Sequence, residues 1–448
     1  MAHTFRGGIH VDEHKHTSHK KTEPMREPDK VSIPMAQHIG APAVPLVKVG
    51  DHVTVGQKIG EVPEGALGCP VHSSISGTVT EISKKLIPTG ASVEYVSIEN
   101  DHMSEPCPDL KPLAKRLTEA TPDEIIEKVR EAGISGMGGA AFPTYAKMRS
   151  AIGKADTLII NCAECEPFIT VNHRLLLENS STVVNGVKIL MRALGVKRVF
   201  IAVEDNKPDA IKILRSLVER SNIIKVEVVK TKYPQGDERQ LIYALTKKEV
   251  PTGKLPADVG CVIFNPETAA AVYRAFVKGT PLISRCVTVD GDCIKKPKNL
   301  LVPIGTSIND LIDYCGGLVK TPKKIVVGGP MMGIAQWDPS MPVTKSTSAV
   351  LVFSDEFDRK KVDTPTCIHC GRCVNNCPMH IMPMYIAQFA QEGDFERAEK
   401  YGAMSCVECG SCSYNCPGGV DIVQFIRVAK AAIRFEQNRA KQQAPKKQ

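Results

Sequence analysis

Two cysteine-rich stretches near the C-terminus carry the clearest chemical pattern in the sequence. They read CIHCGRCVNNCP (367–378) and CVECGSCSYNCP (406–417), and each has the spacing C-x2-C-x2-C-x3-C-P. Thiolates at this spacing hold [4Fe–4S] clusters, and in paired motifs the fourth cysteine binds the other cluster. Zinc needs only four ligands and no three-cysteine run, and a disulfide framework is typical of small secreted domains. The pattern therefore predicts two [4Fe–4S] clusters.

Under this crossing rule, each cluster takes cysteines from both motifs. The first cluster is expected to bind Cys367, Cys370, Cys373 and Cys416, and the second to bind Cys377, Cys406, Cys409 and Cys412. Pro378 and Pro417 follow the fourth cysteines and stop the turn from continuing as helix. Between the motifs, MPMYIAQFAQEGDFERAEKYGAMS has an apolar face at helical spacing, which predicts helical structure interrupted at Gly393.

The composition is that of a soluble protein with several domains. A chain of 448 residues predicts about two to four domains. No stretch approaches the ~18–20 consecutive apolar residues that span a bilayer, and the N-terminus lacks the apolar segment of a secretory signal. Sixteen cysteines in such a chain predict a reducing cytoplasm. The net charge of +8 comes without a basic strip interleaved with aromatic residues, which argues against nucleic-acid binding and suits an acidic partner or an anionic membrane surface.

The first 105 residues divide into a polar arm and a β-rich domain. The arm, residues 1–30, holds five of the twelve histidines without a fixed metal-binding spacing, so we expect an extended polar segment. Residues 31–105 contain short β-branched runs separated by glycines, which predict a small barrel or sandwich. VKVGDHVTVGQKIGEV and HSSISGTVTEI resemble the barrel-sandwich hybrid fold of lipoyl and biotinyl domains. The turn VHSSIS lacks the lysine that those domains modify, so we expect a structural or docking role.

A glycine-rich loop follows a predicted helix in the middle of the chain. Thr121 and Pro122 begin this helix, which ends at Gly133. The loop GISGMGGAAFPTYAKM (133–148) comes next, and its glycines allow the backbone to approach a ligand closely. Lys147 lies on its continuation, where a cation could meet a phosphate. A Rossmann fingerprint would follow a strand, so the pattern leaves open phosphate binding of another kind or a plain loop.

Strands and helices alternate over residues 155–264. The strands ADTLIINCAE, KRVFIAVED and IIKVEVVKTKY alternate with the helices HRLLLENSSTVVNGVKILMRALG and KPDAIKILRSLVER. This order predicts right-handed crossovers and a parallel sheet, whose ligands lie beyond the carboxyl ends of the strands. Four polar segments fall at those ends: NCAECEP (161–167), EDN (204–206), YPQGDERQ (233–240) and FNPET (264–268). Their side chains could bond a ribityl chain and a flavin ring, although we expect EDN to cap a turn.

These segments resemble a known cofactor site. GISGMGGAAFPTYAKM, NCAECEP, YPQGDERQLIYAL and FNPETAAAVYRAF look like the four segments that line the flavin mononucleotide (FMN) and NADH site in the flavin-bearing subunit of respiratory complex I. With the cysteine motifs and the sandwich-like N-terminus, nearly the whole chain resembles the C subunit of the Rnf ion-translocating ferredoxin:NAD oxidoreductase complexes. The resemblance implies cofactor-binding roles for Gly136, Gly138, Gly139, Phe142, Lys147, Asn161, Glu164, Tyr233, Gly236, Asp237, Glu238, Asn265 and Thr268.

Within this set the resemblance assigns separate tasks. The glycine loop and Lys147 are implied to hold the FMN phosphate, and Phe142 to stack on the nicotinamide or adenine ring. The chain departs from the complex I pattern at Met137, Ala163 and Cys165, where the flavin-bearing protein has a basic residue, an acid and a small hydroxyl residue. The isolated CxxC pair that includes Cys165 could be redox-active, but its place in the flavin-site segment favours a packing role.

The resemblance also implies the order of the domains and a fold of mixed α+β and α/β class. We expect a polar arm (1–30), a barrel-sandwich hybrid domain (31–105), an α/β domain that binds FMN and NADH (115–284), a β-grasp-like module without a cofactor (285–345), an α-helical ferredoxin domain with two [4Fe–4S] clusters (360–432) and a disordered tail (433–448). The run GGPMMG within the β-grasp-like module is expected to form a tight turn in preference to a phosphate site.

The implied function is that of an NAD(H)-dependent oxidoreductase component in a membrane-associated, ion-translocating complex. Electrons would pass between NADH and ferredoxin through FMN and the two clusters, and the cofactors would supply the chemistry. The chain would lie peripherally on the cytoplasmic face of the inner membrane, against other subunits. Two alternatives remain at this point: a soluble FMN and iron–sulfur cobalamin reductase, and an electron relay without flavin, which Met137 and Ala163 suggest.

Overall fold

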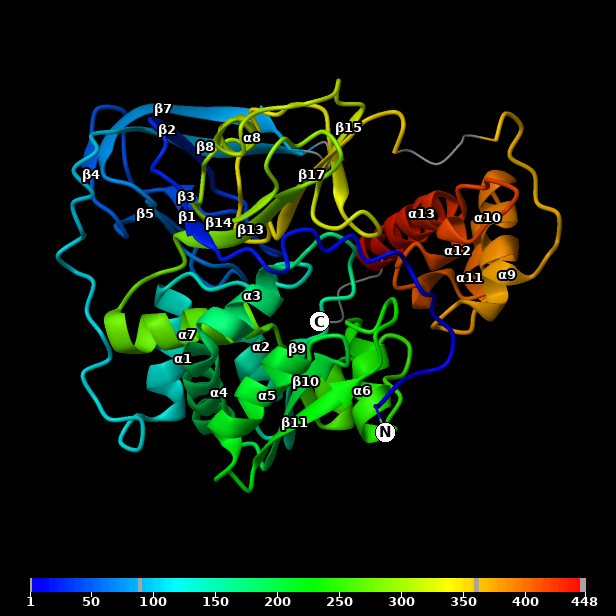
Figure 1. The fold of residues 1–448 in the computed structure, drawn as a ribbon, viewed down its shortest axis with the longest axis horizontal. Helices are drawn as coiled ribbons and strands as arrows, with labels where there is room; N and C mark the ends of the chain where they lie inside the picture. Colours follow the sequence, from blue (N-terminus) through cyan, green and yellow to red (C-terminus); the bar gives the residue numbers. More distant parts are fainter. Residues whose placement is uncertain (1, 88–90, 358–361, 444–448) are drawn as a thin grey trace.

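The computed structural model describes residues 2–87, 91–357 and 362–443. Figure 1 shows an α/β domain below, two β-rich domains side by side above it and a helical domain to the right. The β-rich domains and the helical domain both adjoin the α/β domain, so residues far apart in the sequence can meet at its upper edge. The predicted multidomain fold of mixed class is confirmed.

The N-terminal β-rich domain consists of two antiparallel sheets. The first has the order β2 (Lys30–Pro34), β8 (Ser92–Asn100), β7 (Gly77–Leu86) and β4 (His52–Val53). The second has the order β3 (Val44–Pro45), β5 (Lys58–Glu61) and β6 (Val71–His72). Alternate residues of the first sheet, such as Val31 and Ile33, are fully buried, as expected when one face of a sheet covers a core.

The α/β domain is built on a parallel sheet. Its strands have the order β11 (Ile224–Val229), β10 (Arg198–Glu204), β9 (Thr157–Cys162) and β12 (Cys261–Phe264). The helices are α1 (Pro122–Glu131), α2 (Thr144–Ala151), α3 (Val171–Glu178), α4 (Ser180–Leu194), α5 (Pro208–Val218), α6 (Glu238–Thr246) and α7 (Pro266–Lys278). Helix α1 begins as predicted, because Thr121 and Glu124 form a reciprocal capping box.

One predicted helix of this domain is two helices. The sequence after β9 predicts a single helix over 173–195, but the backbone is not helical at Asn179, with φ −135° and ψ 33°, and α4 begins after it. Asn179 and Ser180 bring side chains that compete for backbone hydrogen bonds and favour helix ends. Gly186 then allows α4 to pack directly on α7, since a Cβ at this position would lie 1.9 Å from the carbonyl oxygen of Ala269.

The second β-rich domain is a six-stranded sheet that exceeds its predicted limits. Its order is β1 (Glu23–Pro24), β14 (Lys298–Pro303), β13 (Ser284–Asp290), β17 (Ala349–Phe353), β15 (Lys324–Val327) and β16 (Ile334–Gln336), with α8 (Ile308–Tyr314) packed on it. Strand β17 lies between β13 and β15, although it comes after residue 345 in the sequence. The run GGPMMG connects β15 to β16 as the predicted turn.

The cluster domain is helical. It contains α9 (Arg372–Asn375), α10 (Pro383–Gln391), α11 (Phe395–Lys400), α12 (Ser411–Tyr414) and α13 (Ile422–Gln443). The predicted break falls at Gly393, which has φ +74°. The disordered tail predicted from residue 433 was wrong as far as Gln443, because the Ala, Lys, Arg and Gln residues there are good helix formers that extend α13. Residues 444–448 lie outside the described residues.

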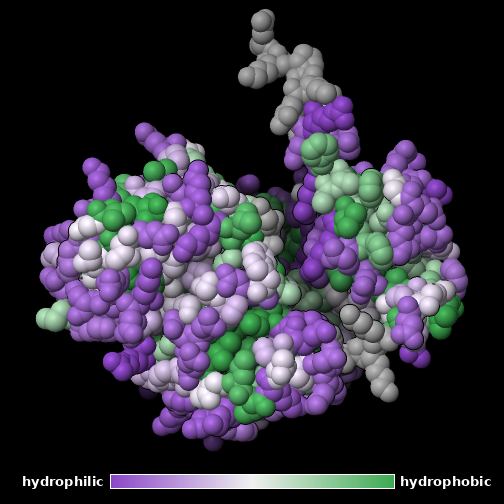
Figure 2. Space-filling model, turned by 90° about the horizontal axis from the view of Figure 1, so that it is seen from above, coloured by the Kyte–Doolittle hydropathy of each residue, from purple (hydrophilic) through white to green (hydrophobic). Residues whose placement is uncertain are grey.

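No helix in the described part of the chain is long and apolar enough to span a lipid bilayer. On the face of the molecule seen in Figure 2, hydrophilic residues predominate and hydrophobic residues form smaller groups.

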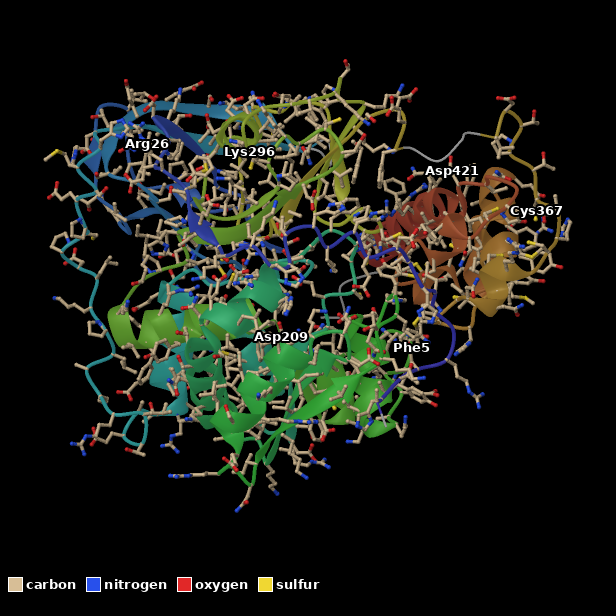
Figure 3. The ribbon with its side chains drawn as sticks, in the orientation of Figure 1. Phe5, Arg26, Asp209, Lys296, Cys367 and Asp421 are labelled. Carbon is tan, nitrogen blue, oxygen red and sulfur yellow. The ribbon has the colours of Figure 1, made fainter. Side chains whose placement is uncertain are left out.

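The N-terminal arm connects all the domains. His3 pairs with Val229, the last residue of β11, and Ile9 pairs with Tyr233. The N–H of Gly8 donates to the carbonyl of Asn376 in the cluster domain, and β1 joins the six-stranded sheet. Figure 3 shows Phe5 of the arm between the α/β domain and the cluster domain. The predicted polar segment is thus an extended strap with specific contacts over its described length.

Candidate functional site

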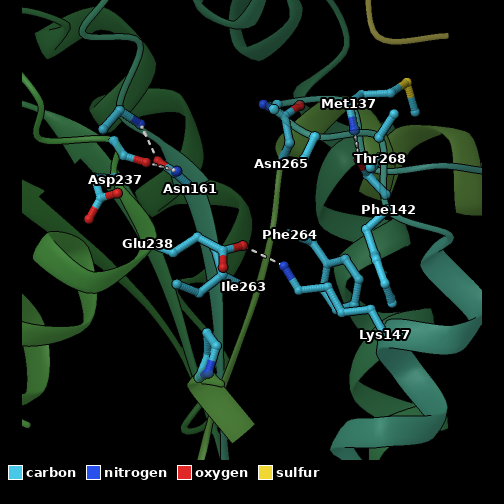
Figure 4. A pocket seen from close by; sticks show the side chains of 18 of the residues that line it. Met137, Phe142, Lys147, Asn161, Asp237, Glu238, Ile263, Phe264, Asn265 and Thr268 are labelled. Carbon is cyan, nitrogen blue, oxygen red and sulfur yellow. Dashed lines mark hydrogen bonds and ion pairs between the residues drawn. The ribbon is translucent and has the colours of Figure 1, made fainter. Parts of the chain in front are cut away.

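The predicted cofactor residues all line one cavity at the carboxyl ends of the parallel strands. The cavity has a volume of about 620 Å³, and Figure 4 shows part of its wall. Its lining includes Gly136, Gly138, Gly139, Phe142, Lys147, Asn161, Glu164, Tyr233, Gly236, Asp237, Glu238, Asn265 and Thr268. The four segments thus come together as expected, while contact of each side chain with FMN or NADH stays a prediction.

The glycine loop is fixed against the start of α7. The N–H of Met137 donates to Oγ1 of Thr268 at 3.1 Å. A Cβ on Gly138 would lie 2.9 Å from Nδ2 of Asn265, so this position needs glycine, whereas Gly139 faces open space. Asn265 itself caps α7 by accepting the N–H of Glu267. Open backbone beside a helix N-terminus is an arrangement that favours anions.

Lys147 is paired with an acid in the cavity. Its Nζ lies 2.5 Å from Oε1 of Glu238 and 5.6 Å from the centre of the Phe264 ring. The cation that we expected to meet a phosphate is therefore already shared with a carboxylate. A phosphate at this position would have to displace Glu238 or share the lysine with it.

The polar residues after β9 and β11 support each other. Asn161 donates from Nδ2 to the carbonyl of Gly236 at 2.7 Å, which links the two segments. Asp237 caps α6 by accepting the N–H groups of Arg239 and Gln240, and burial raises its pKa. These contacts fix the cavity wall before any ligand arrives.

The carboxylate of Glu164 is committed to the protein. It accepts the N–H of Asn172 at 2.7 Å and that of His173 at 3.3 Å, at the start of α3. Burial raises the pKa of Glu164. Glu204, in the segment EDN, pairs with Lys207 at 2.6 Å and is absent from the cavity lining, in agreement with the expected structural turn.

Two lysines from outside the α/β domain hold the loops of the cavity. Lys15, in the arm, donates to the carbonyls of Glu164 (2.9 Å), Glu166 (2.7 Å) and Ile169 (2.6 Å). Lys345, before β17, donates to the carbonyls of Gly133 (2.7 Å) and Pro70 (2.8 Å). Both are desolvated, which lowers the pKa of each, that of Lys345 to about 8.

Glu166 ties the β15–β16 turn to the same site. Its carboxylate accepts the N–H groups of Met331 and Met332, and burial raises its pKa to about 7. A Cβ on Gly329 would lie 2.1 Å from the Glu166 carboxylate, so only glycine allows this approach. Met332 thereby becomes part of the cavity wall.

A cysteine of the second motif also borders the cavity. Cys409 belongs to the lining, and the hydroxyl of Tyr233 donates to its carbonyl oxygen at 2.7 Å. Ile9 of the arm packs in the same buried group as Tyr233 and Cys409. The predicted flavin site and the predicted second cluster therefore share a wall.

The four ligands predicted for the second cluster surround one small internal cavity. It is lined by Cys377, Cys406, Cys409 and Cys412, so a cysteine from the first motif stands with three from the second. This set of thiols suits a [4Fe–4S] cluster. Burial raises the pKa of Cys406 to about 11 in the free protein, and Lys430, which donates to its carbonyl at 2.8 Å, opposes this shift.

The ligands predicted for the first cluster are less enclosed. Cys367 and Cys370 are exposed, whereas Cys373 is buried. The N–H of Thr366 donates to the carbonyl of Gly418 at 3.1 Å, which brings the second motif's end beside the start of the first. Among the described residues, no group of three or more His, Cys, Asp and Glu side chains is placed to hold a single metal ion; a cubane instead takes one thiolate per iron.

The CxxC pair in the flavin-site segment is buried. The sulfur of Cys165 accepts the N–H of Gly236, and burial raises the pKa of both Cys162 and Cys165. A raised pKa disfavours the thiolate that redox chemistry needs, so these residues suit packing.

Known protein families match the chain in four consecutive stretches. Residues 3–103 match the RnfC barrel sandwich hybrid domain and residues 129–274 the Nuo51 FMN-binding domain. Residues 286–335 match the SLBB domain and residues 366–420 a 4Fe-4S dicluster domain. An FMN-binding domain and a dicluster domain are therefore both present.

Relatives extend over almost the entire chain. The sequence is 43% identical over 433 residues to the C subunit of the Na⁺-translocating ferredoxin:NAD⁺ oxidoreductase complex of Acetobacterium woodii, with 96% of this chain and 97% of that protein covered. The chain belongs to the family of Rnf C subunits. A second member, the C subunit of the proton-translocating ferredoxin:NAD⁺ oxidoreductase complex of Clostridium ljungdahlii, is 44% identical over 448 residues, with 98% and 96% covered. The C subunit of the ion-translocating oxidoreductase complex of Rhodobacter capsulatus is 42% identical, with 98% and 85% covered.

The fold of this Rnf family member is also similar to part of NAD⁺-reducing [NiFe]-hydrogenase. The H2-reduced crystal structure aligns with a TM-score of 0.51 at 20% identity over 73% of this chain and 64% of the hydrogenase chain. The air-oxidised structure gives 0.51 at 21% identity over 70% and 62%. The chain thus spans less than two thirds of these hydrogenase chains, and at this identity the likeness concerns the fold alone.

Proposed function

We propose that the chain is the electron-transfer subunit of a membrane-associated, ion-translocating oxidoreductase, where it exchanges electrons between NADH and ferredoxin through FMN and two [4Fe–4S] clusters. The observation that carries the proposal is Cys409, a predicted cluster ligand that lines the same cavity as the glycine loop. The named functions of the A. woodii and C. ljungdahlii relatives support it, since both are subunits of ferredoxin:NAD⁺ oxidoreductase complexes.

The cavity offers groups that suit FMN. The open backbone at Gly139 and the N-terminus of α7 suit its phosphate. Thr144 lines the cavity, and its buried hydroxyl has no hydrogen-bond partner within the described residues. When bound, FMN supplies the conversion between a two-electron hydride and single electrons. The loops held by Lys15 and Lys345 orient these groups in advance.

We place NAD(H) at the outer part of the same cavity. Phe142 is 36% exposed and lines the cavity, so its ring has a free surface on which a nicotinamide or adenine ring can stack. Glu238 stands nearby, half-exposed, and its carboxylate can accept hydrogen bonds from ribose hydroxyls once Lys147 turns to a phosphate. This assignment makes the cavity an enclosed flavin site with an accessible nucleotide face.

The two sets of cluster ligands differ in their access to partners. Cys409 of the second set borders the cavity, whereas Cys367 of the first set lies at the outer edge of the cluster domain (Figure 3). The next residue, Ile368, is 64% exposed, and Met382 in the same domain is 43% exposed. Exposed apolar residues beside a redox ligand suit a protein–protein contact. We therefore assign this edge to the partner subunit that carries electrons onward, on the cytoplasmic face of the membrane.

The test is anaerobic reconstitution of the full chain with iron, sulfide and FMN, followed by titration with NADH. We expect one flavin per chain, about four irons for each cluster, and bleaching of the cluster absorbance by NADH only when FMN is present. Chains with complete clusters that bind no flavin would refute the proposed function and favour a flavin-free relay. Co-purification with membrane subunits separates this function from that of a soluble cobalamin reductase.

A further inference from the structure

One wall of the cavity comes from a domain to which the sequence assigned no cofactor role. Arg285 is the second residue of β13, in the six-stranded sheet, and its side chain is fully buried. It nevertheless belongs to the cavity lining, together with Ser348 from the same sheet region. Arginine is rarely fully buried, and buried polar groups normally have hydrogen-bond partners. The partners of the Arg285 guanidinium therefore need to be identified.

The contacts of Arg285 within the protein leave part of its guanidinium unused. Nε donates to the carbonyl of Thr347 at 3.1 Å, and Nη1 lies 2.6 Å from Oε2 of Glu267 in an ion pair. Neither Nη1 nor Nη2 makes a hydrogen bond of good geometry within the described residues, so the contact with Glu267 is a close charge pair. An arginine carries five N–H donors, and a buried donor without a partner is costly. Arg285 lines the cavity, but its Nη atoms are covered by protein when no ligand is bound, so a ligand can use these donors only if the cavity wall around Arg285 adjusts.

The partner of Arg285 places it on the glycine-loop side of the cavity. Glu267 lies in the first turn of α7, between Asn265, which contacts Gly138, and Thr268, which accepts the N–H of Met137. Arg285 is therefore connected through one residue to the turn that fixes the glycine loop. Glu267 also compensates the charge, so Arg285 can stay buried before a ligand binds.

The phosphate of FMN needs donors that Lys147 alone does not provide. Lys147 is paired with Glu238, and a phosphate monoester brings nearly two negative charges. The glycine-loop backbone and the N-terminus of α7 supply partial charges only. A guanidinium is well suited to phosphate because it donates two parallel N–H groups.

We propose that Arg285 is a further FMN-binding residue, which donates its free N–H groups to the phosphate of the flavin nucleotide. This inference rests on the proposed function, since it assumes that FMN occupies the cavity. It makes the SLBB-containing sheet a direct contributor to the flavin site, in place of a passive neighbour.

The test compares FMN with riboflavin, which has the same ring system and no phosphate. Dissociation constants are measured anaerobically by flavin fluorescence on the full chain with both clusters. For Arg285→Gln we expect FMN affinity to fall by about 10- to 100-fold, as for loss of hydrogen bonds to a charged group, and riboflavin affinity to change by less than about threefold. Arg285→Lys keeps the charge but loses the second donor and should fall between wild type and Arg285→Gln for FMN.

Arg174→Gln is the matched control. Arg174 is also buried, pairs with Glu178 at 2.6 Å, belongs to the same α/β assembly and is absent from the cavity lining. It should leave the affinities for both flavins unchanged. Equal FMN binding by Arg285→Gln and Arg174→Gln would overturn the proposal, as would an equal loss of riboflavin and FMN. If Arg285→Gln does not assemble its clusters, Arg285→Lys is used in its place. A loss of FMN affinity without a loss of riboflavin affinity then supports the proposal, and equal changes overturn it.

Failure of this inference can be distinguished from failure of the proposed function. Wild-type protein that binds no FMN after reconstitution contradicts the proposed function before any variant is compared. Wild-type protein that binds FMN and is bleached by NADH, together with Arg285 variants of unchanged FMN affinity, contradicts the role of Arg285 alone.

Discussion

In the flavin cavity, most lining residues come from separate segments of the α/β domain, while the six-stranded sheet and the cluster domain add others, such as Arg285 and Cys409. Lysines from outside the α/β domain hold its loops. In the cluster domain, all the predicted ligands come from two short motifs, and each motif folds into a single turn around its cysteines. The cavity is thus assembled by long-range contacts, whereas the cluster ligands are brought together largely by local spacing. The predicted exchange of the fourth cysteines, together with the hydrogen bond from Thr366 to Gly418, makes the two motifs depend on each other.

The cavity and the cluster domain therefore depend on different interactions for their shape. The cavity wall is fixed by hydrogen bonds such as those of Lys15 and Lys345, which exist before a cofactor binds. The thiols of the second cluster have raised pKa values because they are buried, and a metal cluster needs them as thiolates. We therefore expect the cavity to keep its shape without flavin, and the cluster domain to depend strongly on iron.

The exchange of the fourth cysteines gives the largest expected effect. Cys377→Ser should remove the second cluster and reduce the iron content from about eight to about four per chain. Because Cys409, one of the predicted ligands of that cluster, borders the cavity, NADH should then bleach the remaining cluster far more slowly. Cys416→Ser is the reciprocal control and should remove the first cluster while leaving bleaching of the second. EPR spectra in which Cys416→Ser abolishes the cluster of Cys406, Cys409 and Cys412 would contradict the exchange.

Local spacing explains which parts of the site could be predicted from the sequence. The cluster cysteines follow from the C-x2-C-x2-C-x3-C-P spacing alone, and Thr121, Pro122 and Gly133 mark the helix before the glycine loop by capping rules. The α/β alternation identifies the sheet and the strand ends. These features were predictable because each is encoded within a few consecutive residues.

Residues that act across domains were not predictable in this way. Lys15 lies in a histidine-rich polar arm, Lys345 in a connection and Arg285 in a strand, and nothing near them in the sequence marks a binding role. Their positions follow from the packing of three domains around the cavity. The same reason explains β17, which completes the six-stranded sheet from beyond its predicted boundary.

Lys15, in the arm, tests whether the cavity depends on contacts from outside the α/β domain. Lys15→Met would leave three partly buried carbonyls without their donor, and an acceptor left unpaired costs up to about 1–3 kcal/mol. We expect the loop after β9 to loosen and FMN affinity to fall by about 10- to 100-fold, with both clusters retained. Lys20→Met is the control, because Lys20 lies in the same arm and donates only to the exposed carbonyl of Pro297 among its hydrogen bonds in the structure. Equal flavin binding by both variants would mean that the cavity does not depend on the arm.

Lys345 predicts a pH dependence of stability. Its pKa in the folded protein is about 8, below the ordinary value near 10.4 for lysine, so the unfolded chain binds more protons between these values. Stability should therefore rise with pH over this range. From pH 7 to 9.5 the wild type should gain about 2 kcal/mol relative to Lys345→Met. Urea unfolding of both proteins at the two pH values measures this difference, and a constant difference would show that Lys345 stays fully protonated when folded.

Lys147 gives the smallest expected effect, although it is the residue that the sequence assigned to the phosphate. Its side chain is partly exposed and paired with Glu238, and exposed ion pairs contribute about 0–1 kcal/mol. Lys147→Ala should weaken FMN binding by only about 3- to 10-fold and leave riboflavin binding unchanged. Adding Glu238→Gln should recover part of this loss, because it removes an unpaired carboxylate that repels the phosphate. If Lys147→Ala weakens FMN binding more than Lys15→Met does, this expectation is wrong. Direct contact with the phosphate would then matter more for FMN affinity than the long-range contacts that fix the cavity wall.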